Sequence, residues 1–220
     1  MRLFLTNESF SSTIVEVEYE RHCSEPASIE TAEGIQLSVP DHLLSAELLP
    51  EHLRTENEAD LSVISACILL KLCESREQRL SLAESCTGGA MASRLTAFPG
   101  SSRVFDFSAV TYSNSMKHRV LSVPWEILDE YGAVSPRTVE MMYRGVLNIN
   151  PGTGACAVSG IAGPGGGSTE KPVGLVYIAT GWNDRSPDIR KRLFSGDRGA
   201  IQHKAVVSAN VQLIHGLLNC

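Results

Sequence analysis

LSLAESCTGG, residues 80–89, is a short apolar run followed by a small polar turn and two glycines. The run has the length of a buried central strand, and residues 89–98 carry apolar side chains at helical spacing. The segment therefore predicts a strand, a turn and a helix, with Ser85 and Cys86 in the turn. A nucleophile of an α/β enzyme commonly occupies such a position.

The turn also has the features of an anion site. A helix N-terminus presents unpaired N–H groups that stabilise an anion or a developing oxyanion. Gly88 and Gly89 allow a ligand to approach that backbone closely. The alternative is that Ser85 and Thr87 only cap the helix, since Ser and Thr are favoured N-cap residues.

A second glycine-rich turn supports the ligand-binding interpretation. ACAVS, residues 155–159, predicts a buried strand that runs into GIAGPGGG, residues 160–167. Five glycines in eight residues cost backbone entropy, and a loop that wraps phosphate or carboxamide groups with its N–H donors needs such small residues. The spacing fits neither the phosphate loop nor the dinucleotide fingerprint. The alternative is a flexible hairpin connection.

The remaining pattern alternates helices and strands. Such alternation predicts a three-layer α/β/α fold with a mixed, mostly parallel sheet and a ligand site outside the strand carboxyl ends. The two strands nearest the C-terminus are separated by a turn-rich segment, so we expect them to pair antiparallel. The expected helices are 61–73, 89–98, 136–147 (after the N-cap Ser135) and 199–218, and the further expected strands are 104–111, 173–180 and 189–194.

The segment TYSNSMK, residues 111–117, supplies candidate proton-transfer groups on the same rim as Ser85. A serine needs a neighbouring base, and a desolvated lysine or a tyrosine can take its proton. For Lys117 this requires a pKa well below the usual value of about 10.4, which burial in a dry cleft supplies. The alternatives are a solvated surface lysine and, for Tyr112, a core residue with a hydrogen-bonded hydroxyl.

Composition divides the chain in two. Residues 1–60 hold 13 acidic and 3 basic side chains, whereas the remainder carries a net charge of +4. We expect an acidic N-terminal appendage of unknown role at 1–56 and a main domain at 57–220. In the appendage, apolar and polar residues alternate at 15–20 and 35–39, which predicts two half-buried strands. A short helix is expected after Asp41.

Several classes of protein are excluded by what the sequence lacks. No apolar run approaches the roughly 18 residues of a membrane span, and MRLFL at the start turns polar at Thr6, so we expect no membrane association and a cytoplasmic protein. The six cysteines form no CxxC pair and no histidines have metal-ligand spacing, so reduced thiols without a metal are expected. Basic runs with interleaved aromatic residues are absent, so nucleic acid is not an expected partner.

Five separated segments resemble, in order, the CinA C-terminal domain family, the nicotinamide mononucleotide amidohydrolases. The resemblance spans residues 57–220. The segments are AESCTGG at 83–89, YSNSMK at 112–117, GAVS at 132–135, SGIAGPGGGSTEKPVG at 159–174 and FSGDR at 194–198. The resemblance implies hydrolysis of the carboxamide of nicotinamide mononucleotide to nicotinate mononucleotide and ammonia, by a homo-oligomer that uses no cofactor.

The same resemblance implies roles for single residues. Ser85 is the expected acyl-forming nucleophile, and Lys117 and Tyr112 are the expected proton-transfer partners. Thr87 with Gly88 and Gly89 is expected to steady the oxyanion. Residues expected to hold the nucleotide are Ser159, Gly163, Gly165, Gly166, Gly167 and Arg198, whose guanidinium suits bidentate phosphate contact. The alternative for Arg198 is a surface residue at a helix start. Ser159 stands where the family commonly has Thr.

Two rival functions remain open from the sequence. A non-catalytic nucleotide-binding module would keep the glycine-rich loop and Arg198 without using Ser85. A cysteine hydrolase would use Cys86 instead, although a residue adjacent to Ser85 is expected to point the other way and buried free cysteines are common in cores.

Overall fold

A computed structural model describes the backbone of four strands within residues 2–39, and the backbone and side chains of residues 61–182 and 185–218. The four N-terminal strands pair antiparallel in the order β1-β2-β3-β4. Their bounds are β1 Arg2–Leu5, β2 Val15–Glu18, β3 Ala27–Glu30 and β4 Gln36–Val39. The strands expected at 15–20 and 35–39 are thus present, whereas the helix expected after Asp41 lies outside the described residues. The domain boundary at 56/57 stays a prediction.

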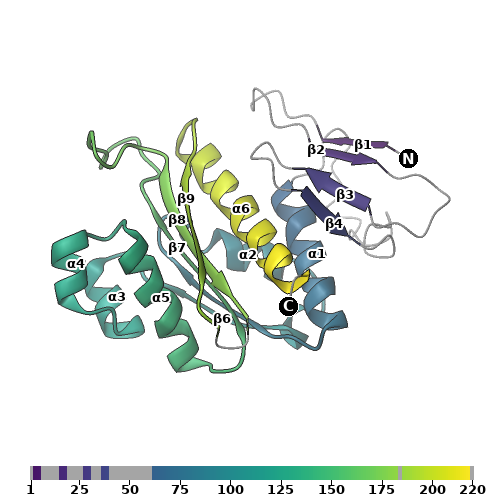
Figure 1. The fold of residues 1–220 in the computed structure, drawn as a ribbon, viewed down its shortest axis with the longest axis horizontal. Helices are drawn as coiled ribbons and strands as arrows, with labels where there is room; N and C mark the ends of the chain where they lie inside the picture. Colours follow the sequence, from purple (N-terminus) through teal and green to yellow (C-terminus); the bar gives the residue numbers. More distant parts are fainter. Residues whose placement is uncertain are drawn as a thin grey trace.

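The main unit is a five-stranded sheet with helices on both faces (Figure 1). Its helices are α1 Leu61–Ser75, α2 Ala90–Thr96, α3 Asn114–Leu121, α4 Trp125–Tyr131, α5 Pro136–Ile149 and α6 Arg198–Leu218, with a short 3-10 turn, η4, at Ser101–Arg103. Its strands are β5 Leu80–Glu84, β6 Phe105–Val110, β7 Gly154–Gly160, β8 Leu175–Gly181 and β9 Asp188–Leu193.

The strand order is β6-β5-β7-β8-β9. β5 pairs parallel with β6 and β7, whereas β8 pairs antiparallel with β7 and β9. Four strands therefore share one direction and β8 opposes them, which confirms the expected mixed α/β sheet and the antiparallel pairing of the last two strands. Ser135 is the N-cap of α5 and accepts from the Thr138 N–H at 3.1 Å, as the Ser-Pro signal predicts.

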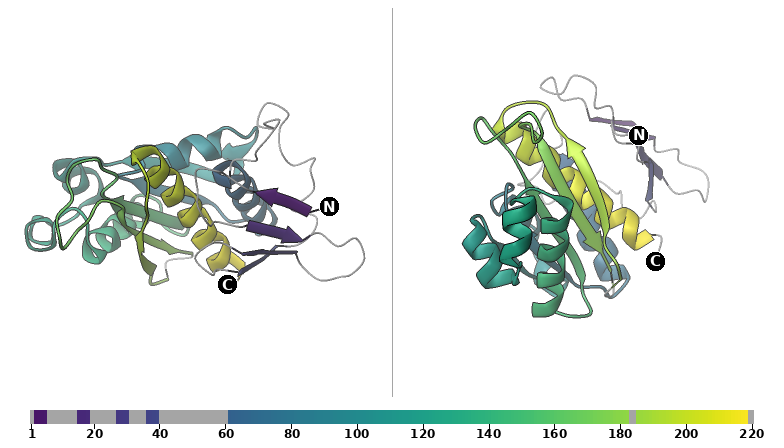
Figure 2. Two further views of the ribbon diagram at one scale, coloured as in Figure 1. Left: turned by 90° about the horizontal axis from the view of Figure 1, so that it is seen from above. Right: turned by 60° about the vertical axis from the view of Figure 1, so that its left-hand side comes forward.

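Side-chain alternation along the strands forms two hydrophobic layers. On β7, Cys156 and Val158 pack with α1, α2 and α6, whereas Ala155 and Ala157 pack with α3, α4 and α5. Figures 1 and 2 show the same division, with α3, α4 and α5 on one face and α1, α2 and α6 on the other. Alternate residues of a strand face opposite sides of the sheet, so Ala155 and Ala157 both face α5. Their small side chains leave room for this helix against the sheet.

The topology brings three turns to one edge of the sheet. Because β5, β6 and β7 are parallel neighbours, their carboxyl ends at Glu84, Val110 and Gly160 lie along the same rim. The turn with Ser85, the segment with Tyr112 and the glycine-rich loop each begin there, as the sequence predicts for a ligand site.

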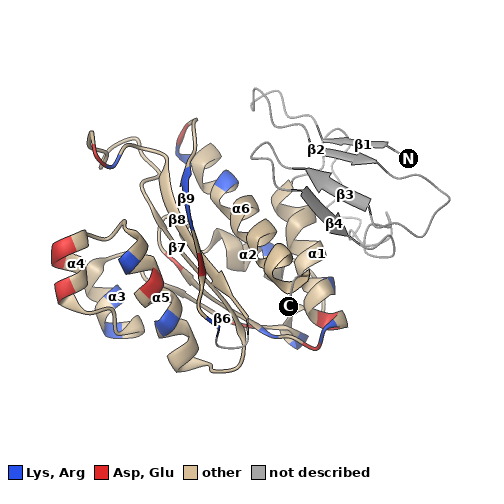
Figure 3. Ribbon diagram, in the orientation of Figure 1, with Lys and Arg blue, Asp and Glu red and all other residues tan. Residues whose placement is uncertain are grey.

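Charged residues of the main unit are grouped by element (Figure 3). Three consecutive cationic residues, 190–192, lie on the edge strand β9, and α4 carries Glu126, Asp129 and Glu130. Charged side chains on an edge strand oppose pairing with a further strand.

Candidate active site

Ser85 lies in the turn between β5 and α2 and is 7% exposed. Its N–H donates to the Val158 carbonyl at 3.0 Å, which continues the ladder with β7 by one residue. Its own carbonyl accepts from the Gly88 N–H at 3.1 Å, which closes a tight turn. Gly88 and Gly89 have φ of 64° and 97°, a left-handed conformation that favours glycine. The two glycines are therefore needed to shape the turn.

Lys117 lies on α3, whose N-cap Ser113 accepts from the Met116 N–H at 3.2 Å. Its Nζ lies 2.9 Å from Ser85 Oγ and donates to the carbonyl of Thr111 at 2.8 Å and, at 3.4 Å, to that of Tyr112. The side chain is 0% exposed, so it is no solvated surface lysine.

Burial changes the acid–base behaviour of this lysine. Desolvation lowers the pKa of Lys117 to about 8 from the ordinary value of 10.5, and the nearby Cys86 thiol opposes the shift. A protonated amine that has lost water is disfavoured unless an anion faces it. The three acceptors around Nζ are uncharged, so a deprotonated amine forms readily near neutral pH.

Cys86 has the opposite character. Burial raises the pKa of its thiol to about 12, against smaller lowering effects from nearby backbone N–H groups, including that of Thr87, and from Lys117. A thiol in this state is not a nucleophile at neutral pH, since the thiolate is the reactive form. The raised pKa of the Cys86 thiol and the contact of Lys117 Nζ with Ser85 Oγ therefore both favour Ser85 over its neighbour.

The N–H groups at the start of α2 have an internal partner. The buried Glu84 carboxylate accepts from the N–H groups of Gly89, Met91 and Ala92 at 3.0, 3.1 and 3.0 Å. The N-cap of α2 is Gly89, without a side-chain cap, so the alternative in which Ser85 and Thr87 only cap this helix is wrong. The Gly89 N–H is likewise not free for a ligand.

Thr87 differs from the glycines that follow it. Its side chain is 3% exposed, and its hydroxyl has no hydrogen-bond partner in the described part of the chain. Thr111, whose carbonyl faces Lys117, has an equally buried and unpartnered hydroxyl. Buried hydroxyls are normally bonded, so the hydroxyls of Thr87 and Thr111 lack the partner that such groups usually have.

Tyr112 and Arg198 meet at the glycine-rich loop. Arg198, the first residue of α6, donates through Nη1 to the Gly163 carbonyl and through Nη2 to the Tyr112 hydroxyl, both at 2.7 Å. Tyr112 is 59% exposed and so is not a core residue. Within residues 61–182 and 185–218, no hydrogen bond joins its hydroxyl to Ser85 or Lys117.

The glycine-rich loop is fixed at both ends. At its start, the buried Ser159 hydroxyl donates to the Ala133 carbonyl at 2.7 Å, so this side chain anchors the loop. At its far end, Lys171 Nζ donates to the Tyr131 carbonyl at 2.6 Å. Between these anchors, residues 165–167 are exposed, and their N–H groups have no acceptor among the described residues. The loop thus offers N–H donors to an anion.

Two contributors to the site are absent from the sequence interpretation. Glu84 is a charged residue at the end of a strand that is otherwise uncharged and fully buried, and this contrast could have identified it from the sequence. Gln202 on α6 donates through Nε2 to the Cys86 carbonyl at 2.7 Å. Its partner lies 116 residues away in sequence, and no local pattern indicates such a contact.

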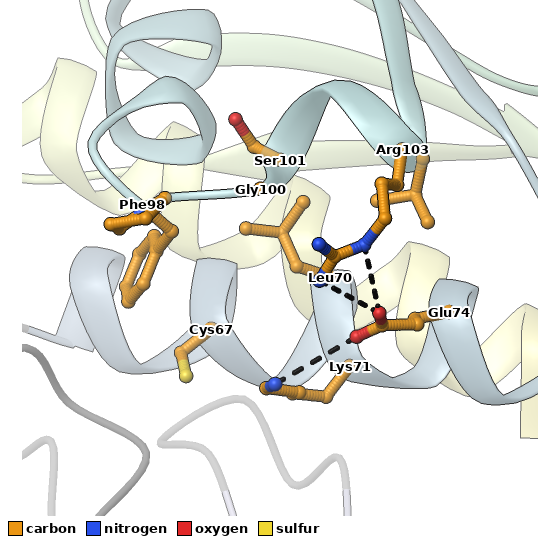
Figure 4. Close-up of a pocket in the computed structure, with 10 residues that line it drawn as sticks. Cys67, Leu70, Lys71, Glu74, Phe98, Gly100, Ser101 and Arg103 are labelled. Carbon is orange, nitrogen blue, oxygen red and sulfur yellow. Dashed lines mark hydrogen bonds and ion pairs between the residues drawn. The ribbon is translucent and has the colours of Figure 1, made fainter.

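A small surface pocket, which contains none of the candidate site residues, is lined by residues of α1 and of the segment 98–104 (Figure 4). It is enclosed between α1 and residues 98–104, beside a cluster in which Glu74 pairs with Lys71 at 3.7 Å and Arg103 at 2.8 Å. Its volume of about 110 Å³ is below the roughly 300–1,000 Å³ of typical ligand sites. We therefore place the candidate site at Ser85.

Neither a metal centre nor a membrane span is found within residues 61–182 and 185–218. No three potential ligands among His, Cys, Asp and Glu gather there. None of the helices in this part is both long enough and apolar enough to cross a bilayer.

The main unit is similar to known proteins. The family model described as "CinA C-terminal domain" matches residues 64–217. A CinA-like protein of Parasynechococcus marenigrum is 45% identical over 156 residues, which are 70% of this chain and 37% of that protein. The nicotinamide-nucleotide amidohydrolase PncC of Pseudomonas putida is 46% identical over 132 residues, 60% of this chain and 81% of that protein.

The fold is also shared with solved structures. The competence/damage inducible protein CihA of Agrobacterium tumefaciens superposes with a TM-score of 0.70 at 38% identity, covering 76% of this chain and all of that one. The chain spans between 32% and 38% of the length of the first three curated relatives it matches.

Proposed function

Because the chain belongs to the CinA C-terminal domain family, we propose that it is an amidohydrolase that converts nicotinamide mononucleotide to nicotinate mononucleotide and ammonia. The amidohydrolase relative from Pseudomonas putida supports this substrate. The observation that carries the proposal is the buried contact of 2.9 Å between Lys117 Nζ and Ser85 Oγ, with the lysine pKa lowered to about 8.

The acceptors around Lys117 direct its lone pair. In the neutral amine, the two N–H bonds are directed to the Thr111 and Tyr112 carbonyls, and the lone pair then faces the Ser85 hydroxyl. Ser85 donates its proton to Nζ as Oγ attacks the carboxamide carbon, which forms a tetrahedral intermediate. Lys117 passes this proton to the departing nitrogen, and ammonia leaves. Water, deprotonated by the same amine, then attacks the acyl carbon. The bond to Oγ breaks, Lys117 returns the proton to Oγ, and nicotinate mononucleotide leaves.

The developing oxyanion needs a hydrogen-bond donor. Gly88 and Gly89 direct their N–H groups to Ser85 and Glu84, so we assign this task to the unpartnered Thr87 hydroxyl. One such donor contributes on the order of 100- to 1,000-fold to kcat in other hydrolases.

The phosphate of the nucleotide is assigned to Arg198 and the N–H groups of residues 165–167. A guanidinium presents paired donors that match phosphate oxygens, and exposed loop N–H groups add to them. The hydrogen bond from Arg198 to Tyr112 favours a binding role for the tyrosine, as a partner that orients the guanidinium. The cytoplasmic location and the homo-oligomer expected from the sequence stay predictions.

The test compares two alanine variants of adjacent residues, with ammonia release from nicotinamide mononucleotide as the readout. Ser85→Ala is expected to lower kcat by at least about 1,000-fold, whereas Cys86→Ala keeps kcat within about threefold. Loss of activity only in Cys86→Ala would establish the cysteine hydrolase. Tight nucleotide binding without ammonia release by the wild-type protein would establish the non-catalytic module.

A further inference from the structure

Glu84 is the most completely satisfied buried charge near the reaction centre. Its carboxylate is 0% exposed and accepts four hydrogen bonds. Oε2 accepts from the N–H groups of Gly89 and Met91, and Oε1 accepts from the Ala92 N–H and, at 3.0 Å, from the Ser108 hydroxyl on β6. Hydrogen bonds to an ionised carboxylate are stronger than those between neutral groups.

These bonds close the chain on itself around the nucleophile. Glu84 is the last residue of β5, and its oxygens bind the backbone from Gly89 onward, so the carboxylate spans the four-residue turn 85–88. One end of the turn is held by the sheet ladder, and the other by this carboxylate. The start of α2 cannot move relative to β5 without breaking the three hydrogen bonds from its N–H groups to the Glu84 carboxylate.

We propose that Glu84 is a positioning residue that holds Ser85 Oγ against Lys117 by fixing the turn 85–88 that carries Ser85, an inference that rests on the proposed function. Glu84 acts through the backbone and does not touch the substrate. A nucleophile held within a few tenths of an ångström of its base reacts far faster than one displaced by about 1 Å, for which losses near 100-fold are typical.

Three variants separate this role from a stabilising one. In Glu84→Gln, the amide oxygen can take the place of Oε2 and keep the bonds to Gly89 and Met91. The NH₂ group then takes the place of Oε1, where it faces the Ala92 N–H and cannot accept a hydrogen bond from it. Glu84→Ala removes all four bonds. Ser108→Ala is the matched control, because it removes one bond to the same carboxylate without touching the turn.

The expected losses in kcat are about tenfold for Glu84→Gln and about 100-fold for Glu84→Ala, with KM within about threefold of wild type. The inflection of the pH profile is expected to stay in place, because the carboxylate acts by geometry. Ser108→Ala is expected to retain wild-type kcat. Rates are expressed per folded molecule, measured by near-UV circular dichroism. Because Glu84→Ala leaves the buried Met91 N–H and the partly buried Gly89 and Ala92 N–H groups without an acceptor, Glu84→Gln provides the test if the alanine variant does not fold.

A second readout is independent of the nucleotide. The rate at which a fluorophosphonate probe labels Ser85, followed by mass spectrometry, reports activation of the serine itself. If wild-type protein is labelled but releases no ammonia, the proposed substrate is wrong, and the labelling rates of the Glu84 variants then decide their role. Failure of the probe to label wild-type Ser85, together with no ammonia release, overturns both proposals.

Other results overturn the role of Glu84 alone. Variants that lose folded protein but react at the wild-type rate per folded molecule show that the carboxylate only stabilises the fold. A moved inflection with full kcat restored at high pH shows that Glu84 acts through its charge and not through position.

Discussion

The pH dependence of kcat/KM follows directly from the burial of Lys117. The free enzyme must hold this amine in its neutral form to accept the Ser85 proton, so kcat/KM rises with pH through the pKa of the free enzyme. That pKa is lowered to about 8, because the side chain is fully buried and faces only neutral acceptors. A lowered pKa for a cationic acid means that the active form is present above about pH 8 and is lost as the pH falls.

The magnitude is set by the neutral fraction of the amine. With a pKa of about 8, about one tenth of Lys117 is neutral at pH 7 and about nine tenths at pH 9. We expect kcat/KM to rise about tenfold between pH 7 and pH 9 and then to change by only about 1.1-fold up to pH 10. An amine with the ordinary pKa of 10.5 would instead give an increase of about eightfold between pH 9 and pH 10.

The assay is ammonia release at nicotinamide mononucleotide concentrations well below KM, from pH 6.5 to pH 10, with circular dichroism at each pH to confirm folding. The substrate phosphate titrates near pH 6, below this window. A rate that still climbs several-fold above pH 9 would show that Lys117 is not desolvated. A flat profile from pH 7 to pH 10 would refute its role as the base.

Three further predictions concern other groups. Lys117→Met is expected to abolish ammonia release yet raise Tm at pH 7. Burying the charged amine costs the wild-type protein up to about 3 kcal/mol of folding free energy at pH 7, a cost that the methionine variant avoids. The pKa of Lys117 is lower in the folded than in the unfolded protein, so the wild type recovers this stability as the pH rises from about 8 to 10.5, and the difference in Tm shrinks over that range. Gly145→Ala is expected to lower the unfolding free energy, measured by urea titration, by about 1–3 kcal/mol, because the new Cβ meets Leu121 at the end of α3. Gly165→Ala is the control, since a Cβ at that position meets no atom within 4 Å. Arg198→Lys is expected to raise KM about tenfold with little change in kcat, since it loses bidentate phosphate contact.

The meeting of Ser85 and Lys117 was predictable because it depends on topology. Their segments follow β5 and β6, which the alternating pattern identifies as strands of one sheet, and parallel neighbours place their carboxyl ends on the same rim. The same reasoning brings the glycine-rich loop there. The short helix α4 is absent from the sequence interpretation, since its N-cap is Pro124, which offers no side-chain cap signal.

The side-chain bonds that shape the rim were not predictable from pattern. Arg198 and Gln202 contact Gly163 and Cys86 across 35 and 116 residues, and periodicity carries no information about such pairs. Ser159 illustrates the same limit. The resemblance implies a nucleotide contact for Ser159, which stays a prediction, whereas no pattern indicates the hydrogen bond that its hydroxyl donates to the Ala133 carbonyl.

The two buried charges near the reaction centre, Glu84 and Lys117, have different hydrogen-bond partners. Glu84 directs both oxygens to backbone N–H groups and Ser108, where the start of α2 compensates the negative charge. Lys117 faces neutral acceptors, and no ion pair joins it to a carboxylate within residues 61–182 and 185–218. A carboxylate turned toward Nζ would hold the amine protonated and raise its pKa. The α2 N–H groups thus hold the Glu84 carboxylate at the start of the helix, and the hydrogen-bond acceptors of Lys117 Nζ are all neutral.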